Sequence, residues 1–196
     1  SNLADTLYLE GRYSDAESLE RETLGIQNRV LGPEHPETLM TMYNLTCALN
    51  TTGSYADAEA LGRKILEDRS RVLGPEHRAT LKTMVSLAIS LRKEARYPEA
   101  EKLLRDALAI QRRTLGPIDQ DEAASLYQLA ILDEQEGKND EALGSLRDAI
   151  NHGLAAEIKN GIGADPELNP LHSDPQFVSL VAEVAVRDAK GKPKKQ

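Results

Sequence analysis

The chain has 196 residues and a net charge of −8, which argues against a nucleic-acid binder that needs a broad basic face. No apolar run approaches the roughly 20 residues that span a bilayer, and the first residues lack the basic and apolar parts of a secretion signal. Cys47 is the only cysteine, so no internal disulfide can form, and a reducing, cytoplasmic location is favoured.

A repeat with a period of 42 residues organises most of the chain. Leu31-Gly32-Pro33-Glu34-His35 returns as Leu73-Gly74-Pro75-Glu76-His77, and again in part as Leu115-Gly116-Pro117. The same offset relates three further series, namely Ala16, Ala58, Ala100 and Ala142; Tyr13, Tyr55 and Tyr97; and Leu3, Leu45, Leu87 and Leu129. So many coincidences at one offset indicate a real structural repeat.

The first residues correspond to a point inside the first helix of a repeat, so the chain begins partway through a repeat. Asn2 occupies the place of Asn44, inside the first of two helices expected per repeat. We therefore expect the natural protein to extend further at its N-terminus, and Ser1 could be a remnant of the cloned fragment.

The second repeat predicts two helices most clearly. Pro36 suits a first helical turn, with His35 just ahead of it. An apolar stripe follows at three- and four-residue spacing, made of Leu39, Met42, Leu45, Ala48 and Leu49. Gly53 ends this helix in a left-handed conformation. A second helix is predicted from about residue 56 to residue 72, and Gly74-Pro75 ends it; its buried side is predicted to be Ala58, Leu61, Ile65, Leu66 and Val72.

Two such helices bury their apolar faces only by stacking on neighbouring pairs. The recurring alanines allow close helix contact, and the tyrosines would act as larger plugs at the turns. The fold class is therefore all-α, a stack of antiparallel helix pairs.

The turn Gly-x-Tyr-x-x-Ala-Glu at this period resembles the tetratricopeptide repeat, over about residues 2–152. The 42-residue length and the Leu-Gly-Pro-Glu-His linkers are similar to the kinesin light chain group. The resemblance implies a right-handed superhelical solenoid that binds other proteins. HEAT and armadillo repeats have similar periods, but they would not explain this turn.

Three segments are predicted: the repeats in residues 1–152, a C-terminal loop and capping helix in residues 153–189, and a disordered basic tail in residues 190–196. The fourth repeat is atypical, because Asn139 replaces the tyrosine and Leu143 the glutamate. Ser173-Asp174-Pro175 starts the capping helix, whose apolar face carries Phe177, Leu180, Val181 and Val184. The stretch from Asp165 to Phe177 is also weakly similar to the termini that follow such repeats in bacterial multidomain signalling proteins, including kinases.

No motif predicts an enzyme, a metal or a cofactor. Phosphate loops, zinc-binding helices and nucleophile elbows are missing from the sequence. Cys47 has no activating histidine in its own turn, and His35 and His77 hold equivalent positions one repeat apart, too far for one zinc ion. Glutamates and arginines four residues apart indicate surface ion pairs; they are Glu17 and Arg21, Glu59 and Arg63, and Glu101 and Arg105.

In this fold the first helix of each repeat lines the concave face. Asparagine is the usual residue at one lining position of kinesin light chain-like repeats, where its amide can bind a peptide backbone. Asn2, Asn44, Ser86 and Gln128 hold that position here, so only two of the four match. Helical arithmetic adds neighbours on the same face: Tyr43, Cys47, Asn50, Lys82, Val85, Ile89, Arg92, Lys93, Tyr127, Ile131 and Glu134. All of these residues are called the groove positions below.

The groove positions predict a protein-interaction scaffold for a peptide segment. Lys82, Arg92 and Lys93, with apolar Val85 and Ile89 between them, favour an acidic peptide with one large apolar anchor. The kinesin light chain resemblance also implies acidic motifs with an aromatic anchor. Two alternatives stay open: a self-assembling or structural spacer, and a regulatory C-terminal segment of a larger signalling protein such as a kinase. A monomer without nucleic-acid or membrane partners is expected.

Overall fold

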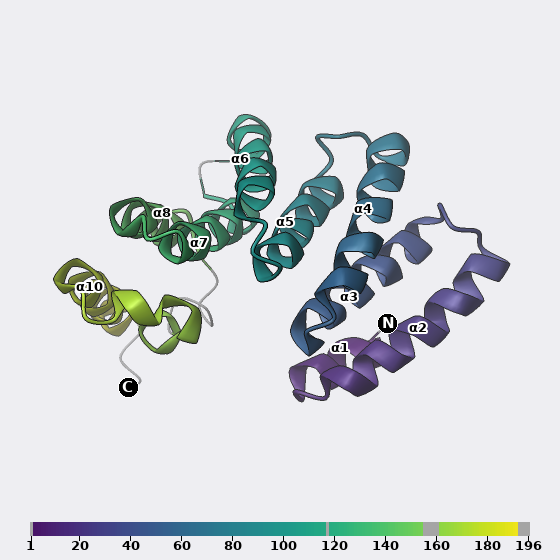
Figure 1. Ribbon diagram of the computed structural model, residues 1–196, viewed down its shortest axis with the longest axis horizontal. Helices are drawn as coiled ribbons and strands as arrows, with labels where there is room; N and C mark the ends of the chain where they lie inside the picture. The colour runs from purple at the N-terminus through teal and green to yellow at the C-terminus, as the bar shows by residue number, and fades with distance from the viewer. Residues whose placement is uncertain (1, 117, 155–160, 192–196) are drawn as a thin grey trace. The chain divides into compact units, whose positions relative to one another are not determined.

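The computed structural model describes residues 2–116, 118–154 and 161–191, and the regular structure in these ranges is helical, with no strand (Figure 1). The chain divides into two compact units, residues 1–103 and residues 104–196. None of the helices in the described ranges is long and apolar enough to cross a membrane. The all-α fold class predicted from the sequence is confirmed.

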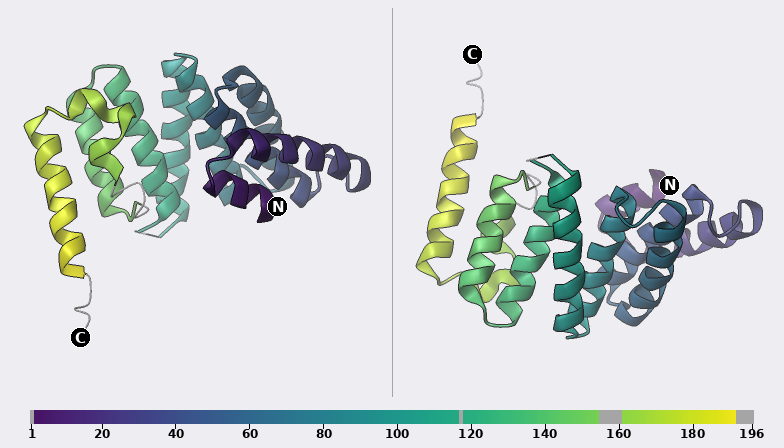
Figure 2. Two further views of the ribbon diagram at one scale, coloured as in Figure 1. Left: turned by 90° about the horizontal axis from the view of Figure 1, so that it is seen from below. Right: turned by 90° about the horizontal axis from the view of Figure 1, so that it is seen from above.

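Unit 1 is built from antiparallel helix pairs. Its helices are α1 (Asn2–Leu9), α2 (Tyr13–Val30), α3 (Pro36–Thr52), α4 (Tyr55–Val72), α5 (Arg78–Lys93) and the first part of α6 (Tyr97–Thr114), which continues into unit 2. Each helix from α1 to α4 packs against the next one, and α3 also packs against α5 (Figures 1 and 2). The first helices of successive repeats therefore lie side by side.

Helix starts and ends follow local chemistry. The ring nitrogen Nδ1 of His35 accepts a hydrogen bond from the backbone N–H of Glu37 at 3.3 Å, and His77 caps α5 in the same way at 3.1 Å. Gly53 ends α3 with φ +88°, a left-handed conformation that glycine adopts without strain. Ala95 stands at the equivalent position after α5 and takes φ +59° although it carries a Cβ.

The core of unit 1 lies along the predicted stripes. Leu39, Met42, Leu45, Ala48 and Leu49 are each at most 3% exposed. On α4, Ala58 and Ile65 are fully buried, and Leu61 and Leu66 are half-buried. The prediction for Val72 is wrong: it is 41% exposed, because it is the last residue of α4 and borders the linker. Tyr13, predicted as a plug, is also 38% exposed.

Unit 2 contains a helix pair and a C-terminal segment. The elements are α7 (Gln120–Gln135), α8 (Asn139–Asn151), the 3₁₀ helices η1 (Ile162–Ala164) and η2 (Pro166–Leu171), and α10 (Pro175–Gly191). Helix η2 packs against α7, whereas α10 packs against α8 and η1. Phe177, Leu180 and Val184 of α10 are buried and Val181 is half-buried, in accord with the predicted apolar face.

The segment boundaries proposed from the sequence stay predictions. The division between the compact units falls inside α6, rather than at residue 152. Helix α10 includes Lys190 and Gly191, the first two residues of the expected tail. The rest of that tail, residues 192–196, and part of the expected loop, residues 155–160, lie outside the described residues.

Candidate functional site

Apart from Asn2 on α1, the groove positions of unit 1 lie on two helices that pack side by side, α3 and α5. On α3, Tyr43, Asn44, Cys47 and Asn50 are all half-buried. On α5, Lys82 and Lys93 are exposed and Val85 and Ile89 are half-buried. We call Tyr43, Asn44, Lys82, Val85, Ile89 and Lys93 the α3–α5 face; it combines apolar, amide and cationic side chains.

Two other groove positions join the helices together. The side-chain amide of Asn50 donates a hydrogen bond to the Ser86 carbonyl at 3.2 Å, and its oxygen accepts one from the Ser90 hydroxyl at 2.9 Å. The Ser86 side chain is only 4% exposed and lies 3.9 Å from the Cys47 sulfur. Asn50 and Ser86 therefore hold α3 against α5. This structural role explains why polar residues occur at these two positions, without a need for a bound peptide.

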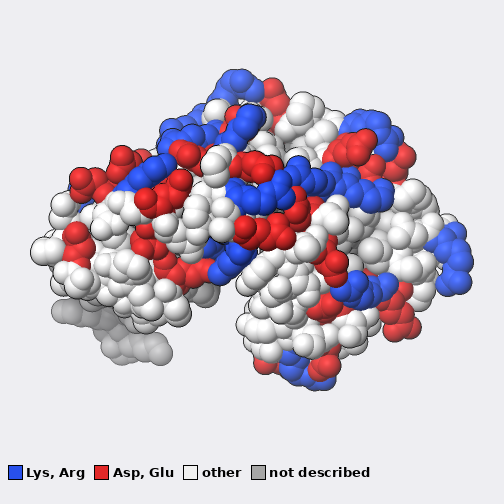
Figure 3. All heavy atoms as spheres, in the orientation of Figure 1, with Lys and Arg blue, Asp and Glu red and all other residues white. Residues whose placement is uncertain are grey.

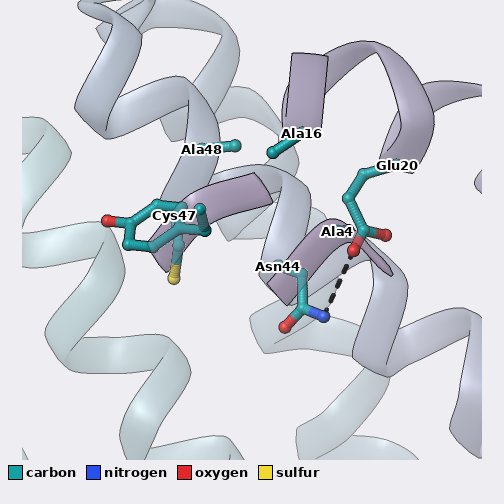
Figure 4. Close-up of a pocket in the computed structure, with 7 residues that line it drawn as sticks. Ala4, Ala16, Glu20, Asn44, Cys47 and Ala48 are labelled. Atoms are coloured by element: carbon teal, nitrogen blue, oxygen red, sulfur yellow. Dashed lines mark hydrogen bonds between the residues drawn. The ribbon is translucent and has the colours of Figure 1, made fainter. Parts of the chain in front are cut away.

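Asn44 borders a small cavity of about 140 Å³ at the start of unit 1. Its amide nitrogen donates to the Glu20 carboxylate at 3.4 Å, and the Ala16 and Ala48 methyl groups point toward one another beside this pair (Figure 4). The cavity is also lined by Ala4, Tyr8 and Cys47. Glu20 is 2% exposed, so a buried carboxylate orients the Asn44 amide. The side chain of Asn2, at the equivalent position one repeat earlier, lies outside the described residues.

The buried arginine Arg69 packs against the ring of Tyr43. The Arg69 guanidinium lies 5.0 Å from the centre of the Tyr43 ring. Its Nη1 donates to the Ala79 carbonyl at 2.8 Å and to the Thr83 hydroxyl at 2.9 Å, and its Nη2 donates to the Leu39 carbonyl at 3.0 Å. Arg69 thus joins α3, α4 and α5, and burial lowers its pKa.

The burial of Arg92 disagrees with its expected place among the displayed cations. It is 3% exposed, and its neighbours Ser90 and Leu91 are at most 1% exposed. The last turn of α5 is buried around most of its circumference, so helical arithmetic alone misplaced this side chain. Lys82 and Lys93 remain exposed on the same helix.

In unit 2, the groove positions of α7 are mostly covered. Tyr127 is 5% exposed, Ile131 1% and Glu134 7%, whereas Gln128 is half-buried. The Tyr127 hydroxyl donates a hydrogen bond to the Asp165 carboxylate, at the start of η2. The expectation that Tyr127 is displayed to a partner therefore conflicts with its burial under the chain's own C-terminal segment.

The cysteine and the two linker histidines, considered above for catalysis or metal binding, have structural surroundings. Burial, above all, raises the pKa of Cys47, so its thiol is a poor nucleophile at neutral pH. The Nδ1 atoms of His35 and His77 accept capping hydrogen bonds, as their helix-start positions predicted. Within the described residues, no three His, Cys, Asp or Glu side chains gather as metal ligands would.

Charges on the surface are mixed and partly paired. Basic and acidic side chains are interspersed on the molecular face in Figure 3. The predicted pairs Glu17–Arg21 and Glu59–Arg63 are present, with closest N–O distances of 2.9 and 2.8 Å. Arg96 also contacts Glu59, and Arg63 reaches Glu99 at 3.4 Å, so the second pair belongs to a network between α4 and α6.

Sequence reasoning missed Arg69, Glu20 and Asp165. Arg69 stands at the repeat position where Gln27 and Gln111 occur, and that departure from the period was a usable signal. Glu20 holds a position without a recurring residue, since Gly62, Leu104 and Leu146 follow at the same offset, and a charged side chain occurs there in the first repeat alone. Asp165 lies outside the period, and only its place before a proline marked it as a helix start.

Comparison with known proteins identifies the repeat. The family model described as tetratricopeptide repeat matches residues 1–70, 48–113 and 80–152. These matches together cover well over half of the chain. No curated protein matches it.

Solved structures share the fold. A Podosopora anserina kinesin light chain candidate with nearly identical TPR-like repeats has 23% identity and a TM-score of 0.72, covering 98% of this chain and 95% of that chain. A point variant of it has 23% identity and a TM-score of 0.73, covering 96% and 92%. BtubC (BKLC) from P. vanneervenii has 19% identity and a TM-score of 0.71, covering 99% and 81%.

Proposed function

Since the chain belongs to the tetratricopeptide repeat family, whose members generally mediate protein–protein interactions, we propose that it holds a peptide segment of a partner on the α3–α5 face. The observation that carries this proposal is the composition of that face. Half-buried Tyr43, Val85 and Ile89 offer apolar surface, and exposed Lys82 and Lys93 lie on the same helix as the last two. Such a mixture suits an extended segment with an apolar anchor and acidic neighbours.

Asn44 is the proposed contact to the peptide backbone. Its amide nitrogen is already directed to the Glu20 carboxylate, 3.4 Å away. The amide oxygen is the group that would accept a hydrogen bond from a backbone N–H of the ligand. A ligand with proline at that point would lose this contact.

The revised set of binding residues follows from burial. Lys82 and Lys93 carry the proposed attraction to carboxylates, without Arg92, because Arg92 is only 3% exposed. Asn50 and Ser86 support the face by joining α3 to α5. Asn2 and Gln128 stay proposed contacts at the equivalent positions of the first and last repeats. We propose no catalytic role and a monomeric scaffold.

Fluorescence anisotropy with labelled peptides tests the proposal. The peptides carry one aromatic residue flanked by Asp and Glu, or by Lys in the charge-reversed set. We expect saturable binding of the acidic set that weakens as salt rises. The double variant Lys82→Glu/Lys93→Glu should bind about tenfold or more weakly, if each contact contributes about 1 kcal/mol.

Lys102→Glu is the matched control. Lys102 is an exposed lysine of α6 that lines a different cavity, of about 430 Å³, together with Arg63 and Glu67 of α4. Its reversal changes the net charge by the same amount per residue and should leave binding nearly unchanged. Equal binding of acidic and basic peptides, or equal effects of the two kinds of variant, would contradict the proposed face. A mass that rises with concentration in light scattering would favour the structural-spacer alternative.

A further inference from the structure

The C-terminal segment of unit 2 reaches α7 through one aspartate. The Asp165 carboxylate accepts a hydrogen bond from the Tyr127 hydroxyl through Oδ2. Its other oxygen, Oδ1, accepts one from the backbone N–H of Glu167 at 2.9 Å and so caps η2. Asp165 therefore starts the short helix and attaches it to α7 at the same time.

Apolar packing accompanies this hydrogen bond. Leu168 and Leu171 of η2 are fully buried, and η2 packs against α7. On the other side, η1 approaches α10 so closely that a Cβ on Gly163 would lie 3.0 Å from the Val181 side chain. Residues 162–171 thus pack against α7 through η2 and against α10 through η1, with Ile162, Leu168 and Leu171 buried and the prolines exposed.

The repeat allows α7 to be compared with the equivalent helix of unit 1, α3. Tyr127 lies 84 residues, or two periods, after Tyr43, and Ile131 lies 84 residues after Cys47. In unit 1, Tyr43 and Cys47 are half-buried at these positions, whereas on α7 Tyr127 is 5% and Ile131 1% exposed. The α7 positions that correspond to Tyr43 and Cys47 are therefore buried within the chain's own fold, and Tyr127 is bonded to the segment itself.

We propose that α7 carries a binding site whose ligand is the chain's own segment Asp165–Leu171, in which an aspartate is followed by two prolines and two leucines. The segment covers Tyr127, so a partner peptide has access to the α3–α5 face but not to this tyrosine. This inference goes beyond the proposed function, and it holds or fails without regard to what binds unit 1.

A synthetic peptide of residues 163–173, Gly-Ala-Asp-Pro-Glu-Leu-Asn-Pro-Leu-His-Ser, supplies the ligand in trans. The unaltered chain of residues 1–196 should show no saturable binding of this peptide, because its site is occupied. A Leu168→Ala/Leu171→Ala chain, whose own segment has lost its two buried side chains, should bind it. Adding Tyr127→Phe to that variant, or replacing the peptide's aspartate by serine, should each weaken binding at least about fivefold, as expected for one hydrogen bond to a charged group.

Tight binding of the peptide by the unaltered chain would overturn the proposal. So would an affinity of the leucine variant that is unchanged both by Tyr127→Phe and by the aspartate-to-serine change in the peptide. Circular dichroism tests whether the Leu168→Ala/Leu171→Ala variant is folded. If it is not, hydrogen exchange of two milder variants decides the question. Asp165→Ser keeps a helix-capping side chain but is too short to reach Tyr127, and Tyr127→Phe removes the hydroxyl alone.

In both milder variants, the amides of residues 120–135 should exchange at least about threefold faster than in the parent chain, while those of α3 stay unchanged. The double variant should exchange no faster than the faster single variant, because both remove the same contact. Unchanged exchange in α7, or fully additive effects, would show that the segment is not held by this hydrogen bond and would refute the proposal.

Discussion

Arg69 provides a sharp test of how unit 1 is held together. The guanidinium of this 2%-exposed residue bonds to the Leu39 carbonyl on α3 and to the Ala79 carbonyl and Thr83 hydroxyl on α5. We consider two substitutions, Arg69→Ala and Arg69→Gln. Glutamine is the chain's own alternative, because Gln27 and Gln111 occupy the same repeat position.

Removal of the whole side chain should be costly. Arg69→Ala deletes three hydrogen bonds, each worth about 0.5–1.5 kcal/mol net or somewhat more for a charged donor. It also deletes the packing beneath Tyr43. The alanine variant no longer buries a charged guanidinium, and this saving in desolvation free energy offsets part of the lost stability. We expect a net decrease of about 2–4 kcal/mol in the free energy of unfolding.

Glutamine should recover part of that loss. The Gln111 amide nitrogen donates to the Asp121 carbonyl at 3.3 Å, ten residues further along the chain. Arg69 makes the matching contact to Ala79, also ten residues ahead. Arg69→Gln can therefore keep one contact to α5 while losing those to Leu39 and Thr83, and we expect a decrease of about 1–2 kcal/mol.

Urea and thermal unfolding followed by circular dichroism measure both variants, with about 2–4 °C in Tm expected per kcal/mol for a chain of this size. Repeat proteins can unfold in parts, so hydrogen exchange of α3 and α5 should accompany them. Amide exchange in α3 and α5 should be slowest in the parent chain, faster in Arg69→Gln and fastest in Arg69→Ala. An alanine variant as stable as the parent, or a glutamine variant less stable than alanine, would refute the reasoning.

Three further substitutions test local features of unit 1 by thermal unfolding. Ala95→Gly should stabilise the chain by about 0.5–1 kcal/mol, because φ is +59° at this alanine and glycine adopts such angles without strain; a lower Tm would contradict this. Ala58→Leu should destabilise by about 1–3 kcal/mol through overpacking, since Ala58 is fully buried; a parent-like Tm would mean that the helix register is wrong. Burial, and then the hydrogen bond with Glu59, raise the pKa of Glu94, so the protonated acid is the form that the fold favours, and its contribution is lost as pH rises through that pKa. Glu94→Gln mimics the protonated form and should raise Tm at pH 7 but not near about pH 3.5; an equal gain at both pH values would point to a cause other than ionisation.

Most of the fold could be predicted because the 42-residue period repeats the residues that start, end and pack the helices. His35 and Gly53 act at the ends of α3 as their residue types require. The apolar stripe on α3 is buried because its spacing matches one face of a helix. Val72 shows where such reasoning fails. A stripe indicates which way a side chain points, but it does not show that Val72 is the last residue of α4, beside an exposed linker.

The candidate site was harder to predict because burial depends on what covers a helix face. Periodicity placed Tyr43 and Tyr127 at equivalent positions, and the structure gives them different surroundings. Tyr127 is bonded to Asp165, which belongs to no repeat. No rule of helical spacing could have placed that segment against α7.

Departures from a repeat therefore deserve more weight than agreement with it when function is sought. Positions that agree in every repeat, such as Ala16, Ala58, Ala100 and Ala142, are all at most 2% exposed and serve packing. Positions that vary differ: Arg69 stands where Gln27 and Gln111 occur and packs against Tyr43, and Glu20, at a position held elsewhere by glycine or leucine, orients Asn44. Both exceptions act on residues of the α3–α5 face. Arg69 also joins α3, α4 and α5, so a residue that departs from the repeat can both stabilise one unit and give one of its surfaces a character that the other repeats lack.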